Sequence, residues 1–136
     1  MNPFHYAFKV KDLESTRRFY CKILGCKEGR SANTWVDFDF FGHQLSAHVS
    51  DNIVELDYCG IVDGLKVPIP HFGCLLLPSQ FETVKQSLLS NEIEFLIQPQ
   101  VRYEGEKGEQ STMFLLDFSG NPIEFKSFTK QAEIFE

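Results

Sequence analysis

Two histidines and one glutamate stand at positions from which they could hold a metal ion. His5 and His71 each begin a segment that reads as a β-strand, and they precede a predicted helix cap by seven and eight residues. Glu124 lies between Ile123 and Phe125, and strand alternation sends its carboxylate to the opposite face from these neighbours. Imidazole and carboxylate ligands suit Fe(II), Mn, Zn or Ni. We therefore predict one metal site formed by His5, His71 and Glu124.

His48 is a fourth candidate for this chemistry. Strand alternation places it on one face with Gln44 and Ser46, so that face is polar. His48 could complete the coordination shell or stand beside the metal as an acid/base, and the sequence favours neither role over the other. His43 falls in a predicted hairpin turn, which explains it without chemistry.

The first half of the chain contains the elements that would position His5 and His48. The segment 5–10 reads as a strand, and Asp12 follows it as the N-cap of a helix. Apolar residues recur at helical spacing up to Leu24, and Gly25 can end the helix in a left-handed conformation. A hairpin follows, with strands at 36–40 and from 44 to 49, and we expect Asp37 and Asp39 to lie on a solvated edge.

The same pattern returns 66 residues later. The segment 71–76 reads as a strand, Ser79 opens a capping box, and Asn91 can close the second helix. Each half therefore follows a strand-helix-three-strand order, βαβββ. One copy alone would expose an apolar face that only a second copy can cover. The last three strands are predicted around residues 94–97, 112–117 and 122–128.

We expect one domain over residues 1–136, because this length is typical of a single core. Residues 1–50 form the first module and residues 71–130 form the second. Residues 51–70 form a connector, punctuated by glycine and proline, that packs on the domain or acts as a lid. Two arrangements are open, in which the modules pair within one chain or swap between two chains, and we expect a homodimer.

Composition excludes several classes of protein. Hydrophobic residues make up 43% of the chain and phenylalanine occurs 14 times, which excludes disorder. The formal charge of −6, without a basic run, argues against nucleic-acid partners. No apolar stretch reaches the roughly 20 residues that span a membrane, and no signal peptide precedes the first strand. We expect a cytoplasmic protein whose four cysteines are reduced thiols that mainly fill the core.

Several motifs together resemble the vicinal oxygen chelate superfamily, which includes glyoxalase I, extradiol dioxygenases, fosfomycin-resistance enzymes and bleomycin-binding proteins. The resemblance spans nearly the whole chain, and its motifs are specific to the superfamily without being specific to one reaction. They are His5-Tyr6-Ala7-Phe8-Lys9-Val10-Lys11-Asp12-Leu13, then Phe19-Tyr20 with Leu24-Gly25, then His71-Phe72-Gly73, and Asp117-Phe118-Ser119-Gly120-Asn121-Pro122-Ile123-Glu124-Phe125.

The resemblance implies an α+β fold in which two βαβββ modules pair into a mixed β-sheet barrel. It also implies a divalent metal that chelates two neighbouring oxygens of a small substrate and stabilises developing negative charge. His5, His71 and Glu124 fall on the ligand positions of the superfamily. Glyoxalase-like members usually carry a glutamate at the fourth position, in the strand that here contains His48.

Among the reactions of the superfamily, the residues favour an extradiol-dioxygenase-like oxidoreductase. Two histidines and one glutamate leave open positions on Fe(II), and His48 would serve as the acid/base. Those enzymes also use a further histidine and tyrosine, and Phe114 supplies no such hydroxyl. One alternative is a glyoxalase-like lyase or isomerase with Ni or Zn. Another is a non-catalytic binding module, such as an antibiotic-sequestering protein, that needs no metal.

Overall fold

The computed structural model describes all residues, 1–136, and they form two compact units. The first unit contains residues 1–55 together with 117–121, and the second contains residues 56–116 and 122–136. No helix in the chain combines the length and apolar character that crossing a membrane requires.

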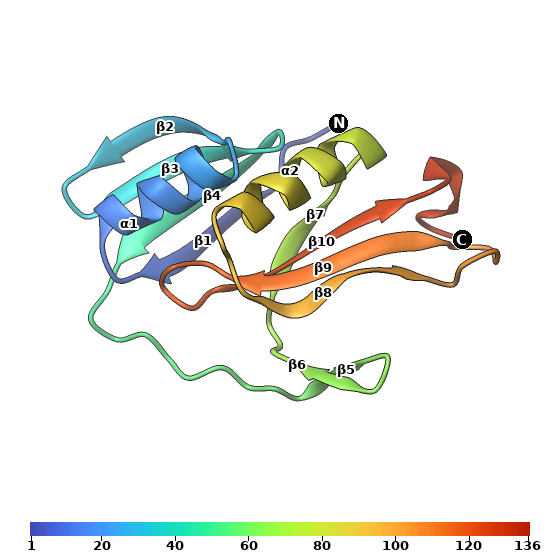
Figure 1. Cartoon of the computed structure of the whole chain (residues 1–136). Coiled ribbons are helices and arrows are strands. Elements are labelled where there is room, and N and C mark those ends of the chain that lie inside the picture. The colour runs from blue at the N-terminus through green and yellow to red at the C-terminus, as the bar shows by residue number, and fades with distance from the viewer. The chain divides into compact units, whose positions relative to one another are not determined.

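The first unit is a four-stranded mixed sheet with one helical segment (Figure 1). Its strand order is β1-β4-β3-β2, with β1 parallel to β4 and the other pairs antiparallel. The elements are β1 (His5–Val10), α1 (Leu13–Arg17), the π-helix η1 (Arg18–Ile23), β2 (Lys27–Ala32), β3 (Trp35–Phe40) and β4 (His43–Val49).

The helical segment of the first unit begins as predicted and then changes its winding. Asp12 is the N-cap, and its carboxylate accepts a 2.7 Å hydrogen bond from the Ser15 amide. This contact lowers the pKa of Asp12 below its usual value. The α-helix gives way to a π-helix at Arg18, which period counting did not predict. Gly25 follows with φ 78°, the left-handed conformation expected at a helix end.

A buried tyrosine links this helical segment to the turn at residues 117–121. Tyr20 is fully buried between Phe8 and Phe38, with ring centroids 5.7 and 5.1 Å away. Its hydroxyl donates a 2.7 Å hydrogen bond to the Asp117 carboxylate, which also accepts amide hydrogens of Ser119 and Asn121. Burial raises the pKa of Tyr20 well above its usual value and raises that of Asp117.

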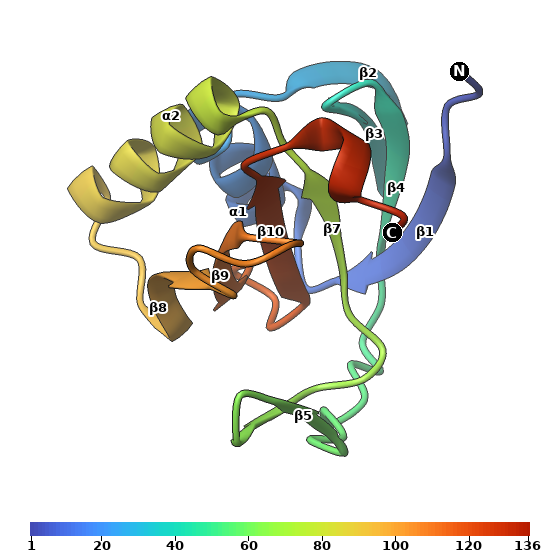
Figure 2. The same cartoon turned by 90° about the vertical axis from the view of Figure 1, so that its right-hand side faces the viewer.

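The second unit repeats this plan. Its main sheet has the order β7-β10-β9-β8, with β7 parallel to β10, and a two-stranded sheet precedes it. In both views α2 and the small hairpin lie on opposite sides of β8, β9 and β10 (Figures 1 and 2). The elements are β5 (Gly60–Val62), β6 (Leu65–Val67), β7 (Phe72–Leu75), α2 (Pro78–Ser90), β8 (Phe95–Arg102), β9 (Gln110–Leu116), β10 (Pro122–Phe128) and a 3-10 turn (Gln131–Glu133).

The start of α2 differs from the prediction by two residues. Ser79 was expected to cap this helix, but Leu77 is the N-cap and Pro78 occupies the first helical position. The Gln80 side chain accepts a 2.9 Å hydrogen bond from the Leu77 amide, which satisfies the backbone where the chain enters the helix. Asn91 ends the helix as predicted.

Each face of the second sheet has its own apolar contacts. Phe81, Val84 and Leu88 are the buried residues of α2, and this helix packs on β10. On the other side, Val67 of the small hairpin joins Ile97 and Phe114 in a buried cluster. The connector predicted to be irregular thus contains a hairpin that covers part of the sheet.

The predicted α+β fold of two βαβββ modules is confirmed. Prediction from periodicity missed β2, whose residues are all exposed, and placed the end of β8 five residues too early. Asp37 and Asp39 were expected on a sheet edge, but β3 is paired on both sides. Each module keeps its own four-stranded sheet, and no strand pairing runs from one sheet to the other to close a barrel.

Candidate metal centre

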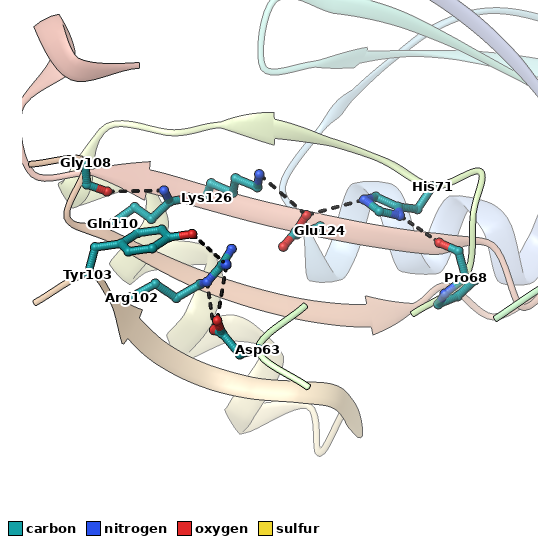
Figure 3. A network of polar contacts seen from close by, with 9 residues as sticks. All are labelled: Asp63, Pro68, His71, Arg102, Tyr103, Gly108, Gln110, Glu124 and Lys126. Carbon is teal, nitrogen blue, oxygen red and sulfur yellow. Dashed lines mark hydrogen bonds and ion pairs between the residues drawn. The ribbon is translucent and has the colours of Figure 1, made fainter. Parts of the chain in front are cut away.

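His71 and Glu124 lie side by side in the second unit. His71 stands immediately before β7, and Glu124 is the third residue of β10, the strand that pairs with β7. The Nε2 atom of His71 is 3.3 Å from Oε1 of Glu124. The Glu124 side chain is only 7% exposed, so its carboxylate is largely removed from water. Figure 3 shows the imidazole and the carboxylate directed toward each other.

Two contacts fix the orientation and the tautomer of His71. Its Nδ1 lies 2.7 Å from the carbonyl oxygen of Pro68, and because a carbonyl can only accept, Nδ1 carries the proton. The Phe114 ring packs against the imidazole at 4.8 Å in an edge-on arrangement. The remaining nitrogen, Nε2, is therefore directed at Glu124 and is free to act as a ligand.

The contact between His71 and Glu124 needs a positive charge or a proton between the two facing atoms. A neutral imidazole with its proton on Nδ1 presents a lone pair to a carboxylate oxygen, so two acceptors face each other at 3.3 Å. A proton on Nε2 or a cation between the two atoms removes this conflict. Metal bonds of about 2.1 Å that meet at tetrahedral or octahedral angles separate two ligand atoms by roughly 3.0–3.4 Å. The distance between His71 Nε2 and Glu124 Oε1 therefore fits two ligands of one metal.

A glycine allows the strand that carries Glu124 to approach β7. Gly73 is paired with Glu124 in the parallel ladder. A Cβ atom at Gly73 would overlap the carbonyl oxygen of Glu124, so no other residue fits without moving the strand. Gly73 is thus a positional requirement for Glu124, in addition to its place in the motif that begins at His71.

His5 is oriented in a similar way in the first unit. It is the first residue of β1, and its Nδ1 lies 2.8 Å from the side-chain oxygen Oε1 of Gln44. Because Oε1 accepts, Nδ1 donates and Nε2 is again left with its lone pair. His5 is exposed within this unit. Both predicted histidine ligands therefore present the same nitrogen.

Strand pairing identifies the position in the first module that corresponds to Glu124. Ala7 lies 66 residues before Gly73, as His5 does before His71. Ala7 is paired with Ser46, whereas Gly73 is paired with Glu124. Ser46 therefore occupies the equivalent place. It is buried, and its hydroxyl donates a 2.6 Å hydrogen bond to Asp37.

His48 lies two residues beyond Ser46 on the same strand face. It is exposed, and its ring lies 6.4 Å from that of Trp35, its neighbour on β3. His5 is paired with Gln44, four residues before His48, so the backbone positions of the two histidines are about 13 Å apart along the strand direction. The acid/base role of His48 stays a prediction. His43 is the first residue of β4, and its Nδ1 accepts the Phe4 amide hydrogen.

Of the predicted ligands, the second unit brings two together. Neither unit gathers three or more histidine, cysteine, aspartate or glutamate side chains into a group that could hold a metal. His71 and Glu124 form a pair, and His5 and His48 belong to the first unit. The three-ligand site predicted from His5, His71 and Glu124 stays a prediction.

Sequence reasoning missed Lys126, which lies beside Glu124. Lys126 follows it on the same strand face, and the Lys126 ammonium lies 3.9 Å from the carboxylate. Arg102 on β8 is held by Asp63 of the small hairpin, with its Nε 2.8 Å from the aspartate. Strand alternation could have placed Lys126 beside Glu124. The hairpin that holds Arg102 had no periodic signal.

Several solved structures share this fold. No protein-family model matches the chain. The crystal structure of a glyoxalase/bleomycin resistance protein/dioxygenase from Alicyclobacillus acidocaldarius has a TM-score of 0.78 and 31% sequence identity, over 98% of this chain and 96% of that one. The fosfomycin resistance protein FosX from Listeria monocytogenes has a TM-score of 0.72 and 18% identity, over 98% and 97%.

A putative glyoxalase family protein from Bacillus anthracis has the same fold, with a TM-score of 0.67 and 18% identity over 95% of this chain and 96% of that one. The duplicated βαβββ plan thus places the molecule in a class of proteins with a shared architecture. Within that class, the chain belongs to the glyoxalase/bleomycin resistance protein/dioxygenase family, part of the vicinal oxygen chelate superfamily. Members of this superfamily generally use a divalent metal ion.

Proposed function

We propose that this protein is a divalent-metal-dependent enzyme that acts on a small molecule with two neighbouring oxygen atoms. One observation carries this proposal. The Nε2 atom of His71 and the Glu124 carboxylate face each other at 3.3 Å, a spacing that suits two ligands of one ion. Two acceptors at this distance with neither a proton nor a metal cation between them would be electrostatically unfavourable.

His71 and Glu124 would hold the metal together with His5. When bound, the ion would polarise the substrate oxygens and stabilise negative charge that develops on them. The chain contributes orientation, because Pro68 fixes the tautomer of His71 and Gln44 fixes that of His5. Phe114 excludes water from one side of the His71 imidazole.

For the reaction, we favour an extradiol-dioxygenase-like oxidation that uses Fe(II). Two histidines and one carboxylate form the ligand set that non-haem Fe(II) oxygenases employ, and it leaves positions open for substrate. His48 is our candidate for the acid/base, since its exposed imidazole shares a strand face with His5. The substrate would be a catechol-like compound.

A glyoxalase-like lyase or isomerase is the second candidate, and one contact favours it. Ser46 occupies the position equivalent to Glu124, and its hydroxyl is bonded to the Asp37 carboxylate at 2.6 Å. A hydroxyl joined to a carboxylate can relay a substrate proton. Zn, Ni or Mn would serve this reaction, because it needs no redox change.

We also propose that the protein works as a homodimer. The presence of one equivalent histidine in each module allows a site to form from modules of one chain or of two chains. Analytical ultracentrifugation with and without Zn²⁺ measures this, and a monomer under both conditions would contradict it.

Zinc titration of metal-free protein tests the site itself. Calorimetry should detect one Zn²⁺ per chain, and affinity should fall by at least about 100-fold in His71→Ala and Glu124→Gln, because each removes a ligand. His5→Ala should lower it as well. His43→Ala is the matched control, since this histidine bonds the Phe4 amide, and its affinity should equal that of the wild type. Unchanged zinc affinity in Glu124→Gln would refute the proposed site.

Reconstitution with Fe(II) under anaerobic conditions, followed by an assay in oxygenated buffer, separates the two reactions. Oxygen uptake upon addition of catechol, with loss of uptake in His48→Ala, would support the dioxygenase. Exchange of a substrate carbon-bound proton without oxygen uptake, and loss of exchange in Ser46→Ala, would support the glyoxalase-like reaction. Tight metal-independent binding of aromatic antibiotics without turnover would instead indicate a sequestering protein.

A further inference from the structure

We infer that the sheet face beside Glu124 recognises an oxyanion group on the substrate, a carboxylate or a phosphonate, through Lys126 and Arg102. This inference rests on the proposed function, because it describes a second part of the same substrate. The ligand class is therefore a small molecule that carries two neighbouring oxygens for the metal and a separate negative charge.

The strand register places both cations on the face of Glu124. Lys126 follows Glu124 by two residues on β10, and Thr112 is its partner on β9. Arg102 on β8 is paired with Gln110, which is a diagonal neighbour of Lys126 across β9. Figure 3 shows Lys126, Gln110 and Arg102 gathered on the side of the sheet toward which Glu124 points.

Lys126 has little to hold it in place. Its ammonium is 3.9 Å from Glu124, which is too long for a hydrogen bond, and this is its one ion pair. Its side chain is about one-third exposed, which leaves donors accessible to a ligand. An ammonium has three donors, and none of them is used in a hydrogen bond here.

Metal binding would make this lysine a stronger anion site. Once Glu124 shares its charge with a divalent ion, the carboxylate no longer neutralises Lys126, and the two cations repel each other. An oxyanion near Lys126 relieves that repulsion. The local charge would then favour ligands with a negative group over neutral ligands of the same shape.

Arg102 is rigidly placed and keeps one nitrogen free. Asp63 binds its Nε at 2.8 Å and its Nη2 at 3.3 Å, and Nη2 also donates to the Tyr103 hydroxyl. These contacts leave Nη1 available on a side chain that is only 15% exposed. A guanidinium fixed in this way binds an oxyanion with little loss of side-chain entropy.

A buried amide oxygen gives independent support for a ligand on this face. Gln110 is 7% exposed, and its Oε1 atom has no hydrogen-bond partner, although its Nε2 donates to the Gly108 carbonyl. An unsatisfied buried acceptor is costly, so such groups usually meet a ligand or water. A hydroxyl of the bound molecule beside the oxyanion would satisfy Oε1.

A matched pair of probes tests this recognition. The probes are 3,4-dihydroxybenzoate and its uncharged amide, 3,4-dihydroxybenzamide, which offer the same two hydroxyls. Calorimetry on the Zn-loaded protein should show at least about tenfold preference for the benzoate, because charge-assisted hydrogen bonds are stronger than neutral ones. Lys126→Gln should reduce this preference to about onefold while affinity for the amide stays unchanged. Arg102→Gln should reduce it as well.

Two controls keep the test decisive. Lys85→Gln removes a cation that is paired with Glu82 on α2, and the preference should persist in this variant. Arg102→Gln combined with Asp63→Asn keeps the local charge balanced if the single variant unfolds. Equal affinity of wild type for both probes, or an undiminished preference in Lys126→Gln, would overturn the inference.

The outcome separates this inference from the proposed function. Zinc binding without any benzoate preference would refute the oxyanion site and leave the metal site standing. A Lys126-dependent preference for the benzoate in protein that fails to bind zinc would refute the metal site and leave the oxyanion site standing. Phenylphosphonate, tested as a competitor of the benzoate, shows which oxyanion the site prefers.

Discussion

The two modules share one scaffold and differ in the side chains that it presents. His5 and His71 occupy equivalent positions, and each donates its Nδ1 proton to a fixed oxygen. At the next equivalent position, however, the first module has Ser46 and the second has Glu124. The two modules thus share the histidine and differ at the neighbouring position.

The modules also differ two residues further along these strands, on the same face of each sheet. His48 in the first module corresponds to Lys126 in the second, because their partners Lys9 and Leu75 are 66 residues apart. At these two positions the first module has a hydroxyl and an imidazole, whereas the second has a buried carboxylate and an ammonium. One architecture can therefore carry a pair of charged side chains in one module and hydrogen-bonding side chains at the equivalent positions of the other.

The largest effect is expected where the modules differ in backbone packing. Gly73→Ala should lower the free energy of unfolding by roughly 2–4 kcal/mol, because the new Cβ would overlap the Glu124 carbonyl. The reverse change at the equivalent position of the first module, Ala7→Gly, should cost only about 0.5–1 kcal/mol. Urea denaturation measures both. A loss in Gly73→Ala no larger than the loss in Ala7→Gly would contradict the close approach of β10 at Gly73.

The buried tyrosine of the first unit should give the next largest effect. Tyr20→Phe leaves Asp117 without one donor and should cost about 1–3 kcal/mol. Burial raises the pKa of Tyr20, so the unfolded chain releases this proton near pH 10 while the folded protein retains it. Wild-type stability should therefore fall as pH rises above about 10.

Denaturant unfolding between pH 7 and 11 measures this dependence. Tyr20→Phe should remove that part of the alkaline decline, and Tyr103→Phe, at an exposed tyrosine, should keep it. An unchanged alkaline slope in Tyr20→Phe would mean that another group controls stability in this range.

The smallest change in stability is expected at Ser46, the residue of the first module that is equivalent to Glu124. Ser46→Ala removes the hydrogen bond to Asp37 and should cost about 1 kcal/mol, since Asp37 is half-buried and water can replace the hydroxyl. Zinc affinity should remain that of the wild type. Calorimetry and thermal unfolding check the two quantities, and a tenfold loss of zinc affinity would make Ser46 a ligand and weaken the contrast between modules.

Much of the fold follows from residue patterns that act locally. Asp12 and Gly25 mark the ends of the first helical segment because a cap and a left-handed turn are short-range requirements. The sequences of β1, β3 and β4 alternate between apolar and polar side chains with period two. By contrast, β2 is exposed on all its residues, so pairing with β3 alone defines it.

The site was less predictable than the fold. The 66-residue repeat located His5 and His71, and alternation located Glu124. The equivalence of Glu124 with Ser46 depends on the register of strand pairing, which could not be predicted from the sequence. Arg102 takes its place through a hairpin whose position is set by packing on Ile97 and Phe114.

The turn at residues 117–121 belongs to the first unit although it joins two strands of the second. Its Asp117 binds Tyr20, and the Asn121 amide donates to the Lys9 carbonyl. A gene split within the connector would thus yield an N-terminal fragment that lacks part of its own hydrogen-bonded interior. Complementation between two such fragments is therefore the expected behaviour, and each half depends on co-expression of the other.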